Sequence, residues 1–150
     1  MKKLTITQPT QKPRYYIGID PGLNTGVAIW DSVRREFEYV QTLKIHNAMQ
    51  MFLQMPEGER MVIVEDARKR KHDKGLIPEK AQGAGSVKRD CKIWEDFLTD
   101  LEIPFQLKAP NGKLNALAQA SNLQMWQRNT KWTERTSEHA RCAAMLVWNT

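Results

Sequence analysis

Hydrophobic and polar positions in the first third of the chain predict three short strands. Tyr15–Asp20 is rich in β-forming residues, ends at turn residues 21–26, and is followed by a second β-rich run, Val27–Trp30. Glu36–Lys44 then alternates apolar and polar side chains, as a half-buried strand does. Because so few residues separate these runs, we expect them to form an antiparallel meander.

A short helix and a buried strand are predicted next. Four apolar residues recur at helical spacing, with Asn47 as a candidate N-cap, and they are Ala48, Met51, Phe52 and Met55. Residues 61–64 are a continuous apolar run that ends at Glu65, which is typical of a strand covered by helices on both faces.

A long helix is predicted from Glu79 to Leu101. Its main apolar row consists of Val87, Cys91, Trp94, Leu98 and Leu101. Ile93 and Phe97 form a second row beside it. The helix therefore packs either on both the sheet and a partner subunit, or on a single core through one wide stripe.

The remaining residues predict one more strand and two helices. The strand is 104–108, and the first helix is Leu114–Trp126, whose apolar face consists of Leu114, Leu117, Ala118, Ser121 and Met125. Thr136 and Ser137 are good caps for a helix that runs to the end of the chain. We expect a flexible basic tail at 1–14 and a single mixed α/β domain at 15–150.

Composition adds a charge to this picture. The 150 residues carry a net charge of +6, with a pI near 9.4, so a polyanionic partner is expected. No apolar run approaches the roughly 20 residues of a membrane span, and the first residues do not form a signal peptide, so we expect a cytoplasmic protein with no membrane contact. Cys91 and Cys142 lack the spacing of a zinc site.

Two carboxylates end strands that should be buried. Asp20 follows Ile17–Ile19, and Glu65 follows the run at 61–64. If these strands are parallel neighbours, both acids emerge at one edge of the sheet, where a divalent cation relieves their repulsion. Either acid alone is better explained by a turn or strand end with an arginine partner, but the pair, in a basic protein, favours a metal.

The final helix begins with a third group of candidate ligands. At about 100° per residue, Glu138, His139 and Cys142 all face one side of this helix. Taken alone, such residues more often cap a helix or stabilise its dipole. The segment 20–26, Asp-Pro-Gly-Leu-Asn-Thr-Gly, serves a hairpin or, alternatively, brings backbone amides to a phosphate.

These motifs together resemble RuvC-type Holliday junction resolvases, especially the short phage or prophage members. The resemblance covers Tyr15–Trp148, and the shared motifs are Ile17–Gly22 with Thr25-Gly26, Glu65, Gly83-x-Gly85 at the start of a helix, and Glu138–Ala144. It implies an RNase H-like fold with strand order 3-2-1-4-5 and a homodimer. It also implies two Mg²⁺ ions per site, or Mn²⁺ in their place, and paired nicks in four-way or other branched DNA.

The resemblance also implies roles for individual residues. Asp20 would bridge both metals, Glu65 would hold one, and His139 with residue 142 would complete the site. The family has aspartate at that last position, whereas this chain has Cys142, a soft and mostly neutral donor that suits Mg²⁺ poorly. Three explanations stay open: Glu138 compensates, the site prefers a softer ion such as Mn²⁺, or the protein is a weakened or inactive nuclease, natural or engineered, that still binds junctions.

Basic residues complete the predicted site. Lys108 and Lys113 flank the end of the last strand and are candidates to stabilise transition-state charge. The predicted DNA-binding residues are Arg68, Lys69, Arg70, Lys71, Lys74, Lys88 and Arg89. Actin- or hexokinase-like ATPases open on a similar glycine loop but clasp their nucleotide between two domains, so no nucleotide cofactor is expected.

Overall fold

A five-stranded mixed sheet forms the centre of the molecule. The computed structural model describes residues 12–56, 58–70 and 78–150, and the side chains of 78–84 lie outside this description. The strands are β1 (Tyr15–Asp20), β2 (Asn24–Asp31), β3 (Glu36–Lys44), β4 (Arg60–Glu65) and β5 (Phe105–Lys108), in the order β3-β2-β1-β4-β5. The first three strands are antiparallel, and β4 and β5 run parallel to β1. This confirms the predicted RNase H-like strand order.

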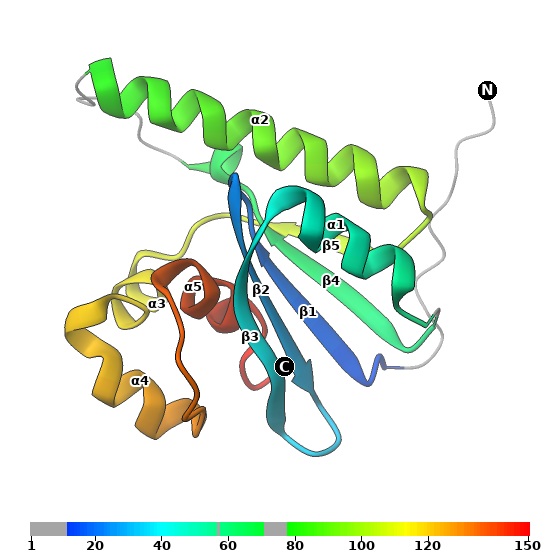
Figure 1. Ribbon diagram of the computed structural model, residues 1–150, viewed down its shortest axis with the longest axis vertical. Coiled ribbons are helices and arrows are strands. Elements are labelled where there is room, and N and C mark those ends of the chain that lie inside the picture. The colour runs from blue at the N-terminus through cyan, green and yellow to red at the C-terminus, as the bar shows by residue number, and fades with distance from the viewer. Residues whose placement is uncertain (1–11, 57, 71–77) are drawn as a thin grey trace.

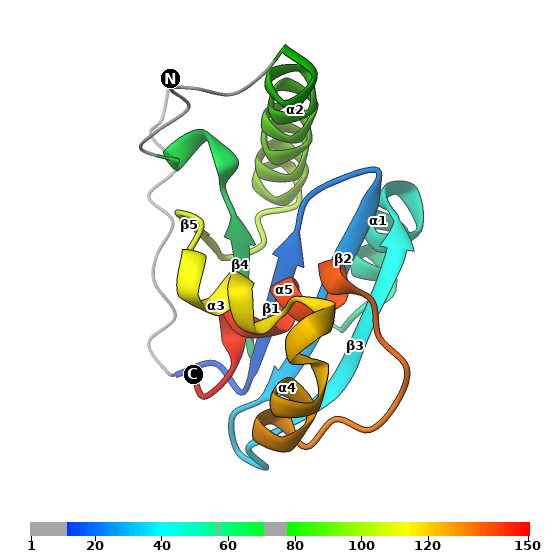
Figure 2. The ribbon, with the colours of Figure 1, turned by 90° about the vertical axis from the view of Figure 1, so that its left-hand side faces the viewer.

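Helices cover both faces of the sheet (Figures 1 and 2). One face carries α1 (Ile45–Gln54) and α2 (Pro78–Asp100), and the other carries α3 (Gly112–Leu117), α4 (Leu123–Thr130) and α5 (Glu138–Val147). Because strand side chains alternate, Ile17 and Ile19 pack toward α1 and α2, while Tyr16 packs toward α5. The sheet therefore separates two apolar cores.

Two glycines let α5 lie directly on the sheet. A Cβ atom on Gly18 would stand 2.1 Å from the carbonyl oxygen of Ala143, and one on Gly26 would stand 1.9 Å from that of His139. No other residue leaves room for this approach. The first turn of α5 is consequently held against the ends of β1 and β2.

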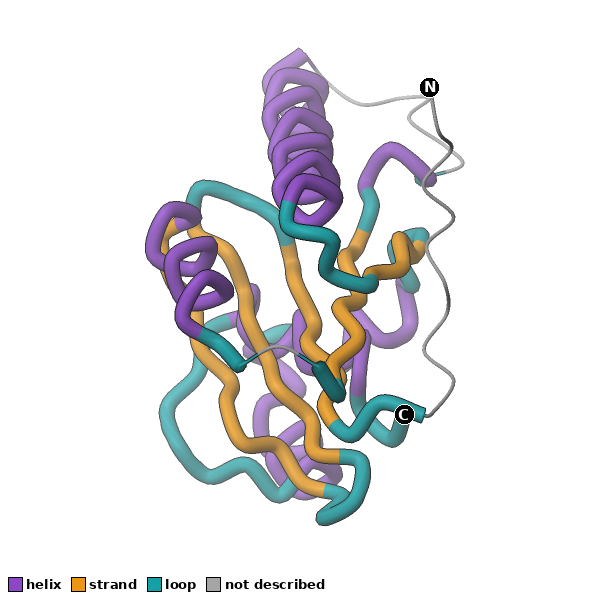
Figure 3. The backbone as a smooth tube through the Cα atoms, turned by 90° about the vertical axis from the view of Figure 1, so that its right-hand side faces the viewer, coloured by secondary structure: helices purple, strands orange, loops and turns teal. Residues whose placement is uncertain are grey.

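The long helix α2 packs mainly on the sheet and on α1. Cys91, Trp94 and Leu98 are buried, and Phe97 makes edge-to-face ring contacts with Phe52 and Trp94. Phe97 of the predicted second row thus belongs to the core, whereas Ile93 stays 41% exposed. The N-terminal part of α2 extends beyond the sheet (Figures 1 and 3). Because α2 begins at Pro78, Gly83-x-Gly85 lies inside the helix and not at its start.

The predicted helix 114–126 is wrong as a single element. The chain forms α3, a 3-10 turn at Ala120–Asn122 and then α4, with the Asn122 amide donating to the Ala116 carbonyl across the break. Since the break shifts the helical phase, Trp126 is fully buried, and Met125, predicted to be core, is 55% exposed.

Several boundaries also differ from prediction, among them the start of β5 at Phe105 and the end of α5 at Val147. Helix α1 begins at Ile45, whose N–H donates to the Leu23 carbonyl, so Asn47 lies in the first turn and is not the N-cap. Strand β2 begins at Asn24 and not at Val27. Arg14, the last residue of the predicted tail, is tied to the domain because its carbonyl accepts a hydrogen bond from the Ser32 N–H. Residues 1–11 of that tail lie outside the described residues.

No helix in the described parts of the chain is both long and apolar enough to span a membrane.

Candidate active site

Asp20 and Glu65 end neighbouring parallel strands and define the site. Ile19 of β1 lies opposite Val64 of β4, so the two carboxylates occupy the next position along the ladder. Parallel neighbours are about 4.8 Å apart, and alternation turns both acids to the face opposite Ile19 and Val64, the face that carries α5. The structure therefore places these acids together, as the sequence predicted.

The closeness of the two acids affects the pKa of Glu65. Partial burial raises this pKa, and the negative charge of Asp20 raises it further. A hydrogen bond from Asn115 and the positive charge of Arg70 act in the opposite direction. Ionised carboxylates this close repel each other, so the edge of the sheet favours a cation between them.

The first turns of α5 bring three further residues to the same edge. His139 Nδ1 lies 3.1 Å from Asp20 Oδ2, and this contact raises the pKa of the exposed imidazole. Cys142 is half-buried, and burial together with the charges of Asp20, Glu65 and Glu138 raises its pKa to about 12. The thiol is therefore neutral at physiological pH, and Glu138 lies close enough to act on it.

These donors fit a divalent cation in part. The oxygens of Asp20 and Glu65 are the hard ligands that Mg²⁺ prefers, and a cation would relieve their repulsion. A protonated thiol at Cys142 does not supply the missing carboxylate. Among the described residues, no three His, Cys, Asp or Glu side chains form a ready metal-binding cluster.

Asn115 is a site residue that sequence reasoning missed. Its Nδ2 donates to Glu65 Oε2 at 3.2 Å, from the middle of α3. It is one of four asparagines between 111 and 129, and only the fold brings this one to Glu65. No local signal in the sequence distinguishes it from the others.

The two candidate lysines lie on the Glu65 side of the site. Lys108 is the register partner of Glu65 across β4 and β5. Phe105 and Leu107 pack toward the other face, so the side chain of Lys108 shares the face of Glu65, and it is exposed. Lys113 is exposed in the first turn of α3, two residues before Asn115.

The structure gives Arg68 a different role from the predicted one. Its guanidinium pairs with Asp66 at 2.8 Å and with Glu95 at 2.6 Å, and both contacts raise its pKa. Two carboxylates thus neutralise Arg68 and tie the 3-10 turn Ala67–Lys69 to α2. These pairs make Arg68 less available to a DNA phosphate than an exposed cation without carboxylate partners.

The other predicted DNA-binding residues differ in their placement. Lys69 Nζ donates to the Leu107 carbonyl, and Arg70 is exposed and close enough to lower the pKa of Glu65. On α2, Lys88 is half-buried, and Arg89 is exposed with its guanidinium 3.6 Å from Asp90. Lys71 and Lys74 lie outside the described residues.

The glycine segment 20–26 forms the hairpin between β1 and β2. Thr25 is buried, and its hydroxyl donates to the Gly22 carbonyl at 2.7 Å, which closes the turn. Gly26 lies within β2, paired with Asp20 on one side and Thr42 on the other. Its backbone is therefore committed to the sheet and to close packing against α5.

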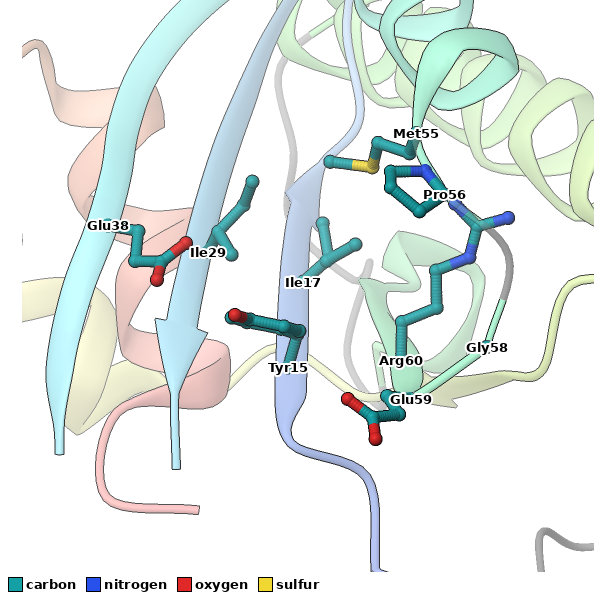
Figure 4. A pocket seen from close by; sticks show the side chains of 9 residues that line it. All are labelled: Tyr15, Ile17, Ile29, Glu38, Met55, Pro56, Gly58, Glu59 and Arg60. Carbon is teal, nitrogen blue, oxygen red and sulfur yellow. The ribbon is translucent and has the colours of Figure 1, made fainter. Parts of the chain in front are cut away.

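A separate cavity of about 370 Å³ opens at the other end of β1 (Figure 4). It is lined by Tyr15, Ile17, Ile29, Glu38, Met55, Pro56, Gly58, Glu59 and Arg60. Tyr15 and Asp20 are the two ends of β1, roughly 17 Å apart at 3.3 Å per residue. None of the described candidate site residues lines this cavity, so it is distinct from the carboxylate site.

Comparisons with known proteins identify the fold. No protein-family model and no curated protein matches the sequence. The structure is similar to that of T. thermophilus RuvC in complex with a Holliday junction substrate, with a TM-score of 0.56 and 14% identity. The alignment covers 90% of this chain and 91% of that chain. The chain therefore has the RuvC-like form of the RNase H-like fold, over nearly its whole length.

Proposed function

We propose that this protein is a metal-dependent endonuclease that cuts four-way or other branched DNA. The observation that carries the proposal is the pairing of Asp20 and Glu65 at the ends of adjacent parallel strands, beneath α5. The structure of similar fold, T. thermophilus RuvC, is a complex with a Holliday junction substrate. The net charge of +6 also suits a DNA ligand.

Within this proposal, four residues have defined roles in phosphodiester hydrolysis. Asp20 and Glu65 would hold Mg²⁺ or Mn²⁺, which when bound activates water and stabilises the leaving oxygen in phosphodiester hydrolysis. His139 orients the Asp20 carboxylate through its Nδ1 atom. Lys108, in register with Glu65, would stabilise negative charge on the phosphate.

We include a homodimer in the proposal because of symmetry. A four-way junction has approximate two-fold symmetry, and a two-fold dimer would present one site to each of two strands. Paired nicks would follow from that geometry.

A second candidate is a branched-DNA-binding protein with weak or no cleavage. The neutral, half-buried thiol of Cys142 favours it, because the site then has one carboxylate fewer to balance bound cations. In this case the basic residues would still bind DNA.

A cleavage and binding assay separates the two candidates. A labelled four-way junction and a duplex of matching sequence are incubated with the protein in Mg²⁺, Mn²⁺ or EDTA. Paired nicks in the junction alone, lost in EDTA, support the nuclease, whereas junction binding without nicks supports the second candidate. Equal binding of both DNAs, without cleavage, contradicts both.

A further inference from the structure

We propose that Asn115 is a positioning residue that orients the Glu65 carboxylate for cation binding. The proposal rests on the proposed function and extends it to a residue that the sequence pattern does not indicate. Its basis is the hydrogen bond from Asn115 Nδ2 to Glu65 Oε2 at 3.2 Å.

The chemistry of the two groups determines the direction of this bond. An ionised carboxylate only accepts hydrogen bonds, so Asn115 presents its NH₂ group to Glu65. An uncharged amide restrains the carboxylate without neutralising it, whereas a lysine in the same place would compete with a cation. Asn115 therefore suits a role in orienting a metal ligand.

Asn115 is itself held firmly. The Asn111 side chain caps α3 by accepting from the N–H groups of Lys113 and Leu114, and the Asn115 N–H donates to the Asn111 carbonyl at 2.9 Å. Leu114 and Leu117 pack against the core beneath α5. Because α3 also contacts α5, Asn115 links Glu65 to the layer that carries His139.

Each of the two carboxylates is contacted by one side chain from the covering helices. His139 of α5 contacts one oxygen of Asp20, and Asn115 of α3 contacts one oxygen of Glu65. Each carboxylate extends from the sheet, and each restraining side chain comes from the covering helices. With cysteine at position 142, the orientation of the two remaining acids matters more for holding a cation.

The test compares Asn115→Ala with Asn122→Ala. Asn122 is a matched control. Its side-chain amide also supports α3, by donating to the Ala116 carbonyl, but this hydrogen bond does not involve Glu65. Mn²⁺ binding is measured by electron paramagnetic resonance, and the Glu65 side-chain orientation by crystal structures of each variant. We expect Asn115→Ala to weaken Mn²⁺ binding by about tenfold or more and to release Glu65 from its orientation, while Asn122→Ala retains both.

Three results would overturn the proposal: unchanged Mn²⁺ affinity in Asn115→Ala, equal losses in both variants, or an unchanged Glu65 orientation. The crystal structures keep the test independent of the proposed function. If the wild-type protein binds no Mn²⁺ and cuts no junction, the proposed function fails, and Glu65 orientation alone still decides whether Asn115 positions it.

Discussion

At the scale of single residues, Cys142 has the largest consequence for chemistry. The resemblance to RuvC-type resolvases implies an aspartate at this position, whereas the Cys142 thiol, with a pKa raised to about 12, carries no charge near neutral pH. The site therefore has two strand-end carboxylates and an exposed Glu138, with no acid at position 142.

Replacing Cys142 by Asp should increase Mg²⁺-dependent cleavage. The new carboxylate would add a hard oxygen ligand beside Asp20 and Glu65, so we expect a gain of about tenfold or more in junction cleavage at limiting Mg²⁺. Initial rates over a Mg²⁺ titration provide the measurement. Unchanged cleavage, combined with a complete loss in Glu138→Ala, would show instead that Glu138 compensates.

Asp31 should control acid stability at a distance from the site. It is fully buried, pairs with Arg14 and accepts from the N–H groups of Val33 and Arg34, which together lower its pKa to about 2. Its stabilising effect is present above the ordinary aspartate pKa of about 3.9 and is lost as the pH falls through the folded value.

The variant Asp31→Asn should be less stable at neutral pH and less sensitive to acid. Urea unfolding at several pH values between 2 and 6 would measure this, with the exposed Asp96→Asn as a control. The explanation is wrong if Asp31→Asn and wild type lose the same free energy of unfolding over this range.

The residues differ in how far the sequence could predict them. Asp20 and Glu65 each follow an apolar run, but the expectation that they meet needed their strands to be parallel neighbours, which the resemblance implied and the structure shows. Asn115 could not be found, because its contact joins positions 50 residues apart through the packing of α3. The ion pairs of Arg68 could not be predicted, because a run of charges does not show which cations pair with acids on a distant helix, here Glu95.

At the scale of elements, the contact of α5 with the sheet depends on glycine. Gly26→Ala would place a Cβ 1.9 Å from the His139 carbonyl, so the start of α5 must move away from Asp20. Overpacking of this kind costs about 1–3 kcal/mol. We expect this loss in urea unfolding, together with reduced Mn²⁺ binding.

Gly85→Ala provides the matched control. This glycine lies inside α2 with open space around its Cβ position, so alanine should stabilise the protein by about 0.5–1 kcal/mol. Equal stability changes in both variants would contradict the role assigned to Gly26.

Element boundaries were harder to predict than element types. Strand β3 was predicted with its observed limits, although a bulge opposite Ile29 and Trp30 interrupts its alternation. The break between α3 and α4 was not, since apolar residues continue on both sides of it and the bond from Asn122 to the Ala116 carbonyl is a tertiary detail.

At the scale of the whole molecule, the strand order could be predicted, and the DNA-binding surface stays a prediction. The order 3-2-1-4-5 followed from the resemblance and is observed. The homodimer, the metal ions and the phage or prophage type stay predictions. The net charge of +6 has a clearer meaning, because Lys108, Lys113 and Arg70 are exposed around the carboxylate edge, whereas Arg68 is neutralised.

Arginines 68 and 70 should therefore respond differently to alanine substitution. Arg70→Ala should weaken junction binding, because the exposed cation near Glu65 is lost. The slope of the logarithm of the binding constant against the logarithm of the salt concentration should fall by about one, the value for one phosphate contact. Arg68→Ala should mainly lower stability, by breaking its pairs with Asp66 and Glu95. Binding isotherms at several salt concentrations and thermal melts would measure both effects, and the reverse pattern would contradict the assigned surface.

The most direct test of the central claim is junction cleavage by Glu65→Gln beside Glu36→Gln. Both substitutions remove one negative charge from a strand residue, but Glu36 pairs with Arg34 at the start of β3, away from the Asp20 end of the sheet. With Mn²⁺ and a labelled four-way junction, we predict that wild type and Glu36→Gln make paired nicks and that Glu65→Gln retains junction binding with cleavage reduced at least about a hundredfold. Full cleavage by Glu65→Gln would contradict the account.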